Sequence, residues 1–327
     1  MQLRRKAASP HNKTMRILVI GAGAVGGYFG GRLAEAGRDI TFLVRSHQAE
    51  TIRKHGLRIL SPHGNATLQP KLISADKIAG AYDLILLCVK AYSLADAMND
   101  FAAAVGPSTI ILPLLNGMRH LELLTRRFGE DSVIGGVCLI AAEVDGEARI
   151  VQLTDIHRLV YGECQQGNSA RMSALNEVMR GANFEARTSG NILQEMWEKW
   201  VMLASLGGAT CLMRGNIGEI EAIPGGADLA RAILGECNAI AVACGYAPGP
   251  PFLARTEKML TTRGSSLTSS MYRDLTRNHA VEVDQILGDL LERGRKLDIT
   301  SPLLEAACVS LQIYQARLVA RDAQAHF

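Results

Sequence analysis

The chain has 327 residues, which is enough for two domains that each bury a core of their own. It is 48% hydrophobic and 20% charged, the composition of an ordinary globular protein rather than of a disordered chain. The formal net charge is +3, but Arg4, Arg5, Lys6 and Lys13 lie in the first fourteen residues, which hold no acidic residue. Without this segment the chain is nearly neutral, which excludes the charge pattern of a nucleic-acid-binding protein.

The segment 1–14 is basic, yet no apolar stretch follows its charges, so it does not fit a secretory signal. We expect a disordered extension or a wrongly assigned start, because Met15 directly precedes the first predicted strand; a transit peptide is the weaker alternative. No apolar run reaches the roughly 18 residues that span a membrane. The seven cysteines, without C-x-x-C spacing, predict reduced thiols in a cytoplasmic protein and no metal site.

Residues 16–20 form an apolar, β-branched run that predicts a strand. A glycine-rich turn, a helix that ends at Gly37 and a second strand over Ile40–Val44 follow, which together make one strand–helix–strand unit. Two continuous apolar runs, 83–90 and 108–115, predict strands buried on both faces, as in a parallel sheet. The helical pattern over 94–105 connects them.

The pattern changes after Gly117. We expect three consecutive strands over 133–144, 148–153 and 157–163, with a hairpin at Asp145-Gly146, then a helix over 169–180 and a strand over 184–188. From residue 191 onward the predicted elements are helices over 191–206, 227–244, 251–262, 272–296 and 302–320. The predicted fold class is therefore α/β: an N-terminal Rossmann-type dinucleotide-binding domain (15–189) followed by an all-α C-terminal domain (190–327).

The sharpest motif is a glycine-rich turn between the first strand and the first helix. Its first glycine permits a tight turn, its second lets the backbone approach a diphosphate, and its third lets the helix pack closely on the strand. The free N–H groups and the dipole at the helix N-terminus attract phosphates. The predicted cofactor-binding loop consists of Gly21, Gly23, Ala24, Val25 and Gly26.

The tip of the second strand distinguishes the two nicotinamide dinucleotides. NAD-specific proteins place an Asp or Glu there, which binds the 2′-hydroxyl of the ribose. This strand ends instead in Arg45, whose guanidinium would pair with the 2′-phosphate of NADP; the alternative is a solvated strand-end residue. We therefore expect NADP. Lys90 and Asn116 follow the next two strands at the same sheet edge, and either could contact the nicotinamide ribose.

The stretches GAGAVGGYFG, VKAY, LLNGM, a Trp-x-Lys helix and SSMYRDL…HAVEVD make nearly the whole chain from Met15 resemble the ketopantoate reductase family. The resemblance implies NADPH-dependent reduction of 2-dehydropantoate to pantoate, in pantothenate and coenzyme A biosynthesis. It implies that Lys199 is the catalytic lysine and that Glu282 holds the substrate and this lysine. It further implies a place near the cofactor for Lys90 and Asn116, and substrate contacts from Asn116, Ser270 and Asp274.

The family pattern K-x-x-x-N-x-x-x-N is not kept after Lys199. Leu203 and Gly207 stand where the resemblance leads us to expect two asparagines. Loss of a hydrogen-bonding partner for a substrate hydroxyl changes discrimination strongly. We therefore expect a pocket that accepts a different, less polar keto acid as an alternative to ketopantoate.

Hydride transfer to a ketone places negative charge on the carbonyl oxygen, which then needs a proton or a positive charge. Lys199 can supply it, because its apolar surroundings would lower its pKa; the alternative is a surface pair with Glu195, four residues earlier. Ser270 and Glu282 would lie roughly 18 Å apart in one continuous helix. If both bind one substrate, Ser270 must lie in a turn that leads into the helix. His120 has no partner at metal-ligand spacing and receives no role.

Three functional hypotheses follow. The first is a reductase of 2-dehydropantoate, the second a reductase or dehydrogenase of another small 2-keto or hydroxy acid, and the third an NADP(H) sensor without catalysis. The expected partner is a small keto acid, with no nucleic acid and no membrane. The apolar C-terminal helices fit a homodimer interface and a core equally well.

Overall fold

Strand β1 (Arg16–Ile20) is the centre of a five-stranded parallel sheet in the order β5-β2-β1-β6-β7. Its side chains alternate between two cores: Ile17 and Val19 pack on one face, and Leu18 and Ile20 on the other. The computed structural model describes residues 14–165 and 169–324, so the predicted extension over 1–14 lies almost entirely outside the described residues. The other strands are β2 (Asp39–Leu43), β5 (Lys71–Ile73), β6 (Leu84–Leu87) and β7 (Ile110–Pro113). The predicted parallel sheet is confirmed.

Helix α1 (Ala24–Glu35) lies between this sheet and a second sheet. Its glycines allow close contact on both sides: a Cβ on Gly30 would come within 2.7 Å of Phe42, and one on Gly31 within 2.7 Å of Ile59. The remaining helices of the N-terminal part are α2 (Ser46–His55), α3 (Leu94–Asp100), α4 (Arg119–Phe128) and α5 (Ala170–Met179).

The second sheet has the order β10-β9-β3-β4, and β8 pairs with β9 in antiparallel orientation. The hairpin predicted at Asp145-Gly146 joins β8 to β9. The two strands predicted over 148–153 and 157–163 are instead one strand. Residues 153–156 do not end the strand; they form a bulge opposite β8, since Ile140 pairs with His157 but Ala142 pairs with Gln152. The strands are β3 (Leu57–Leu60), β4 (Ala66–Leu68), β8 (Ile134–Val144), β9 (Ile150–Glu163) and β10 (Glu185–Thr188).

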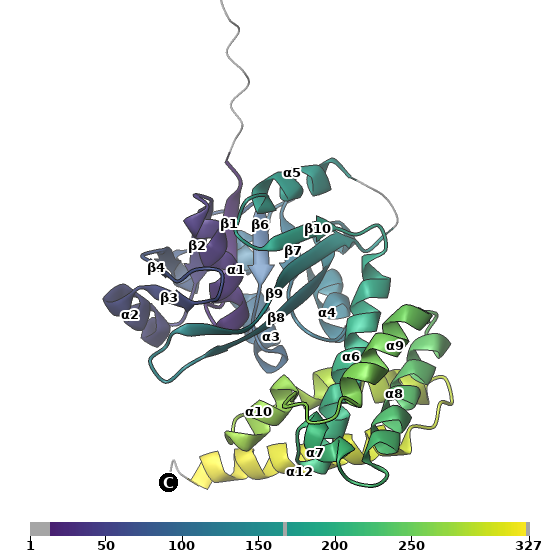
Figure 1. Ribbon diagram of the computed structural model, residues 1–327. Helices are drawn as coiled ribbons and strands as arrows, with labels where there is room; N and C mark the ends of the chain where they lie inside the picture. Colours follow the sequence, from purple (N-terminus) through teal and green to yellow (C-terminus); the bar gives the residue numbers. More distant parts are fainter. Residues whose placement is uncertain (1–13, 166–168, 325–327) are drawn as a thin grey trace, which may run out of the picture.

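The long helix α6 (Ile192–Met213) leaves the sheets and runs into a bundle of helices (Figure 1). Trp197 and Trp200 are fully buried on it, in a core that continues to one face of the parallel sheet. This arrangement confirms the predicted fold class, with an α/β part followed by a helical part. The other helices are α7 (Ile217–Glu221), α8 (Gly226–Ala243), α9 (Pro250–Leu260), α10 (Ser270–Thr276), α11 (Asp289–Arg295) and α12 (Pro302–Gln324).

The single helix predicted over 272–296 is wrong. Helix α10 ends at Thr276, and Asn278 then adopts a left-handed conformation (φ 56°) that turns the chain. The chain becomes helical again in a π-helical segment (Asp284–Gly288) that leads into α11. The expectation that Ser270 lies in a turn is also wrong, because Ser270 is the first residue of α10. The break at Asn278 instead separates Ser270 from Glu282, so the two residues do not lie in one continuous helix.

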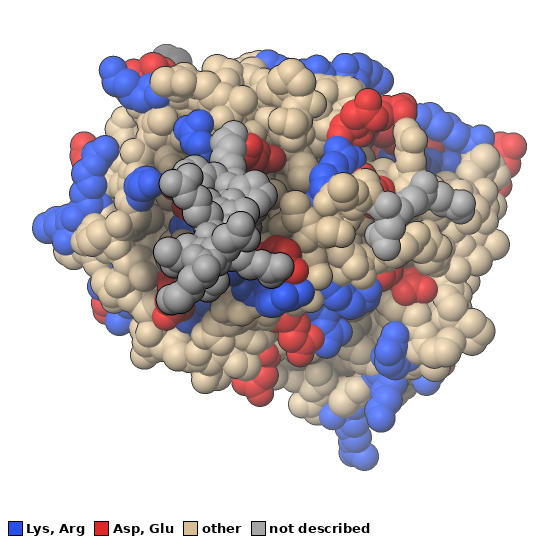
Figure 2. All heavy atoms as spheres, turned by 90° about the horizontal axis from the view of Figure 1, so that it is seen from above, with Lys and Arg blue, Asp and Glu red and all other residues tan. Residues whose placement is uncertain are grey.

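Charged side chains are mixed on the face that carries α5 and the N-terminal end of the described chain. Figure 2 shows lysine and arginine interspersed with aspartate and glutamate there. Among the described helices, none combines the length and the hydropathy needed to cross a membrane. All seven cysteines are free thiols, four of them buried.

Candidate active site

The glycine turn has the geometry that a diphosphate requires. Gly21 has a φ of 89°, and a Cβ on Gly26 would lie 2.1 Å from the Gly21 carbonyl oxygen, so only glycine lets α1 begin this close to β1. At Gly23, by contrast, no described atom lies within 4 Å of the position of a Cβ. Gly23 is the N-cap of α1, and no side chain caps the helix. Open space therefore meets free N–H groups, which fits a bound dinucleotide phosphate.

Arg45 lies at the end of β2 and forms the N-cap of α2. Its side chain is exposed, and its guanidinium has no hydrogen bond or ion pair with another described residue. The side chain is thus free to reach a phosphate next to the glycine turn. Its assignment to the 2′-phosphate stays a prediction.

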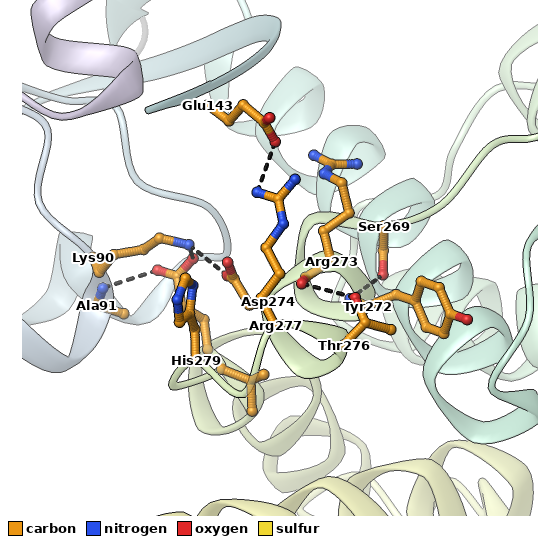
Figure 3. A network of polar contacts seen from close by, with 12 residues as sticks. Lys90, Ala91, Glu143, Ser269, Tyr272, Arg273, Asp274, Thr276, Arg277 and His279 are labelled. Atoms are coloured by element: carbon orange, nitrogen blue, oxygen red, sulfur yellow. Dashed lines mark hydrogen bonds and ion pairs between the residues drawn. The ribbon is translucent and has the colours of Figure 1, made fainter. Parts of the chain in front are cut away.

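Lys90 connects the sheet part with the helical part. Its Nζ lies 3.0 Å from Asp274 Oδ2 and 3.3 Å from Glu282 Oε2, and the Ala91 N–H donates to Glu282 Oε1 over 2.9 Å (Figure 3). Burial disfavours the ammonium, but the carboxylates of Glu282 and Asp274 outweigh it and raise the pKa of Lys90. Nearby, Figure 3 shows Arg277 directed toward Glu143 of β8, which lies 2.9 Å away, whereas the Arg273 guanidinium donates to the Thr268 carbonyl at 3.1 Å. The carboxylates assigned to the substrate thus hold a lysine assigned to the cofactor.

Lys199 lies in the second turn of α6 and is only partly exposed. Burial lowers the pKa of this lysine, and the acidic groups of Cys138 and Glu282 oppose the shift. The alternative pair with Glu195 does not form, because Glu195 binds Arg187 at 3.0 Å. Among the described residues, none forms a hydrogen bond with Lys199 Nζ. Its amine is therefore available to a ligand.

Glu282 contacts a different lysine from the one expected. The resemblance implies that it holds Lys199, but in this structure its two oxygens bind Lys90 and the Ala91 N–H. Its effect on Lys199 is electrostatic. Glu282 is buried, with 8% of its surface exposed, so these two contacts compensate the desolvation of its charge.

Asn116 follows β7, and its backbone is held from the helical part. Its carbonyl oxygen accepts a hydrogen bond from Gln285 Nε2 at 2.8 Å, and the same nitrogen lies 3.2 Å from His120 Nδ1. Gly117, with a φ of 78°, lets the Gln285 backbone approach. Sequence reasoning missed Gln285 and His120. The only available signal was that each lies within four residues of a motif residue, Glu282 or Asn116.

Ser270 is the first residue of α10, one turn before Asp274, so the two side chains lie on the same side of this helix. The capping role goes to the preceding Ser269, whose hydroxyl accepts from the Tyr272 N–H at 3.0 Å and lies 2.9 Å from Thr210 Oγ1. No described residue forms a hydrogen bond with the Ser270 hydroxyl. Ser270 is thus free to bind a ligand.

The positions that differ from the expected asparagines are apolar in the structure as well. Leu203 lies one turn after Lys199 and is partly buried. One turn further on, a Cβ on Gly207 would lie 2.4 Å from Met271 Cε, so this methionine fills the space above the glycine. The surface next to the Lys199 amine therefore offers hydrocarbon where the family pattern leads us to expect amides.

The described residues include no group of three or more His, Cys, Asp or Glu side chains that would hold a metal ion. What converges instead is a glycine turn for a dinucleotide, a lysine with a lowered pKa and two carboxylates beside the sheet edge. Such a site belongs to the nicotinamide-dinucleotide-dependent oxidoreductases that act on a CH–OH group.

Comparison with known proteins gives the family. The model of "Ketopantoate reductase PanE/ApbA" matches residues 17–166, and that of "Ketopantoate reductase PanE/ApbA C terminal" matches residues 191–315. The chain therefore belongs to the ketopantoate reductase family.

Individual relatives agree with this membership. The chain is 36% identical to an uncharacterized oxidoreductase, YkpB of Bacillus subtilis, over 92% of this chain and 99% of that protein. It is 28% identical to a solved 2-dehydropantoate 2-reductase of Geobacter metallireducens, with a TM-score of 0.83 over 91% of this chain and 99% of that one. A D-mandelate dehydrogenase solved with NADH and anilino(oxo)acetate has the same fold, at 20% identity and a TM-score of 0.84 over 93% and 99% of the two chains.

Proposed function

We propose that this enzyme reduces 2-dehydropantoate to pantoate with NADPH. The observation that carries the proposal is a lysine, Lys199, whose amine is unengaged among the described residues and whose pKa is lowered by burial and raised in part by the charge of Glu282, which is itself bound to Lys90 at the edge of the sheet. Family membership and the solved 2-dehydropantoate 2-reductase support this choice of reaction.

The cofactor would be held by the glycine turn. Gly21 makes the tight turn, Gly23 leaves room for the diphosphate against the first N–H groups of α1, and Gly26 lets the helix begin there. The exposed Arg45 would pair with the 2′-phosphate, which is the reason for preferring NADP over NAD. When bound, NADPH supplies the hydride.

The chain's own groups handle the substrate. Lys199, as ammonium, donates its proton to the carbonyl oxygen while the carbonyl carbon is reduced, and it is left as a neutral amine. Ser270, with the N–H groups at the start of α10, would bind the substrate carboxylate, and Glu282 would accept a hydrogen bond from the hydroxyl that forms. Lys90 holds the carboxylates of Glu282 and Asp274 in place through its two ion pairs. Asn116 would contact both cofactor and substrate.

The direct test mixes the purified protein with NADPH and ketopantoate and follows the loss of nicotinamide absorbance. We expect oxidation in the wild type and a rate lower by about 10²–10⁴-fold in Lys199→Ala. Arg45→Ala should weaken the preference for NADPH over NADH and leave the NADH rate unchanged. NADPH binding without turnover of any keto acid would contradict the proposal and favour a sensor.

A second candidate substrate is a 2-keto acid with a less polar side chain. Leu203 and the Met271–Gly207 contact favour it, because they place hydrocarbon beside Lys199. A panel with 2-oxo-3-methylbutanoate and phenylglyoxylate decides the matter: a higher kcat/KM for either than for ketopantoate selects this second candidate. Leu203→Asn should then move the preference toward ketopantoate.

A further inference from the structure

His120 is a buried polar residue that the proposed mechanism does not use. It lies in the first turn of α4 with none of its surface exposed. Its Nδ1 faces Gln285 Nε2 at 3.2 Å, while its Nε2 is buried and has no hydrogen-bond partner among the described residues. A buried polar atom without a partner costs free energy comparable to a lost hydrogen bond. The free-energy cost of leaving His120 Nε2 without a partner suggests that this nitrogen has a function.

The hydrogen-bond network fixes which ring nitrogen of His120 carries the proton. The Asn116 carbonyl oxygen can only accept, so the group that faces it at 2.8 Å must be the amide nitrogen of Gln285 and not its oxygen. That nitrogen has only hydrogens to offer, so His120 Nδ1 must accept the second one. Burial, followed by the charge of Lys199, lowers the pKa of His120 to about 3, so the ring is neutral. The proton therefore sits on Nε2, as an N–H donor without an acceptor.

The π-helical segment contacts both α4, where Gln285 faces His120, and α6, which carries Lys199. The indole N–H of Trp200, next to Lys199 on α6, donates to the Ile286 carbonyl at 2.9 Å, and Ile286 follows Gln285. This bond fastens α6, one residue after Lys199, to the segment that holds His120. The charge of Lys199 acts on the His120 ring, as expected for neighbouring groups.

Among the described residues, four other acidic groups and one thiol lie on the elements packed around Lys199 and His120: Glu282, Glu195, Glu198, Glu122 and Cys138. Cys138 on β8 is a neutral thiol, because burial raises its pKa to about 11. Glu282, in the segment before the π-helix, acts on Lys199 through its charge and is bound to Lys90. On α6 itself, Glu195 pairs with Arg187, and Glu198 accepts from the Gly249 N–H at 3.3 Å. On α4, Glu122 pairs with Arg293.

We propose that His120 is a positioning residue whose Nε2–H donates a hydrogen bond to the amine of Lys199 once this lysine has given up its proton. The Nε2–H cannot form a hydrogen bond with the ammonium of Lys199, because an ammonium has no lone pair and only donates. It can donate to the neutral amine, which has one lone pair. It therefore stabilises the state that follows proton transfer and makes Lys199 a stronger acid. Gln285 enforces the tautomer and carries the effect from the Asn116 loop to the lysine.

Two variants separate this role from a structural one. His120→Asn places an amide group where Nδ1 lies, so it keeps an acceptor for the Gln285 amide but removes the donor at the position of Nε2. His120→Gln reaches the position of Nε2 and keeps the donor. The proposal rests on the proposed function, because it requires Lys199 to donate the proton during reduction.

The measurement is the pH profile of kcat for keto acid reduction, whose rate falls as Lys199 loses its proton at high pH. In His120→Asn we expect this fall to move upward by about one pH unit, the effect of one hydrogen bond of ordinary strength, with KM unchanged. In His120→Gln it should stay within about 0.3 unit of the wild type. An unmoved profile in His120→Asn, or equal shifts in both variants, would mean that His120 serves packing alone.

A second readout needs no substrate. The ¹⁵N spectrum of the His120 ring, assigned by its loss in His120→Asn, should show a proton on Nε2 and none on Nδ1 from pH 5 to pH 9. Titration of Lys199 Nζ, assigned with Lys199→Met, should give a higher pKa in His120→Asn than in the wild type. The opposite tautomer, or an equal Lys199 pKa, overturns the proposal. If no keto acid is reduced, the proposed function fails while these spectra still decide the role of His120.

Discussion

Lys199 and the second and third glycines of the nucleotide turn, Gly23 and Gly26, differ in how each affects the stability of the folded chain. Lys199 is held where burial disfavours its charge, so its pKa is lowered and the folded state is less stable than it would be with an apolar residue there. Gly23 and Gly26 are three residues apart, but one faces open space and the other faces backbone. At this scale, substitutions can separate function from stability.

Lys199→Met should raise the thermal midpoint by a few degrees and reduce kcat by at least about a hundredfold. Because the folded-state pKa lies below 10.5, the unfolded chain binds more protons between these two values, and wild-type stability rises with pH across this interval. The gain from the substitution is therefore full below the folded-state pKa and disappears above 10.5. Unfolding at several pH values measures it. The exposed Lys258→Met is the control, and an equal gain there would contradict the assignment.

Gly23→Ala and Gly26→Ala form a matched pair. A Cβ at position 23 meets no described atom within 4 Å, so Gly23→Ala should cost at most about 1 kcal/mol of stability but weaken NADPH binding at least tenfold, because the methyl group occupies the phosphate space. A Cβ at position 26 lies 2.1 Å from the Gly21 oxygen, so Gly26→Ala should destabilise by about 2–3 kcal/mol. Chemical denaturation and fluorescence titration test both. Unimpaired NADPH binding in Gly23→Ala would remove the turn from the cofactor site.

At the scale of elements, the break between α10 and the π-helical segment positions two of the carboxylates of the candidate site. Asn278 turns the chain with a φ of 56°, and the Tyr314 hydroxyl and the Gln315 side chain bind backbone groups at 279 and 281. The break brings Asp274 and Glu282 to the same lysine from two different elements. A continuous helix would direct them to places far apart.

Asn278→Val should destabilise the protein by about 1–2 kcal/mol, because a β-branched residue strains the left-handed conformation, and it should also lower kcat/KM by displacing Glu282. Asn183→Val is the control, since Asn183 has a φ of 53° at a turn remote from Lys90. Its loss of stability should be similar, without a change in kcat/KM. Equal kinetic effects in both variants would show that the break does not position Glu282.

Elements whose conformation is determined by adjacent residues could be predicted from the sequence. The run 16–20, the glycine turn and the hairpin at Asp145 are encoded by adjacent residues, and all three formed as predicted. The break at Asn278 was missed because no glycine or proline marks it and its partners lie on α12, far along the chain. The bulge at 153–156 was predicted as a turn because its cause is a pairing shift with β8. His120 and Gln285 become meaningful only once α4 and the π-helical segment meet.

At the scale of the whole molecule, the two parts of the chain are joined around Lys90. The Ala91 N–H bond to Glu282, the ion pairs of Lys90 and the Glu143–Arg277 pair all cross between sheet and helices. Partly exposed ion pairs contribute about 0–1 kcal/mol each. Of the three contacts just named, the bond from the Ala91 N–H to the buried Glu282 carboxylate therefore contributes most. The backbone of Ala91 is therefore a natural reporter of contact between the two parts.

Glu282→Ala should increase the hydrogen-exchange rate of the Ala91 amide about tenfold or more, because it removes the acceptor of this N–H. Asp274→Ala is matched to it: it removes an ion pair of Lys90 but leaves the Ala91 bond intact, so the exchange rate should change much less. Amide exchange followed by mass spectrometry or NMR resolves the two. Equal rates in both variants would mean that Ala91 is protected by the sheet part alone.

The position of α1 between two sheets has a consequence for how the chain is made. One side of this helix is covered by strands that leave the ribosome almost at once, but the other rests partly on β8 and β9, which are complete only at residue 163. For the time that translation takes to add more than a hundred residues, Gly27 and Tyr28, which contact Ile150 and His157 of β9, lack part of their cover. The nascent enzyme is thus exposed to chaperones and to aggregation until its last long strands arrive, well before Lys199 is synthesised.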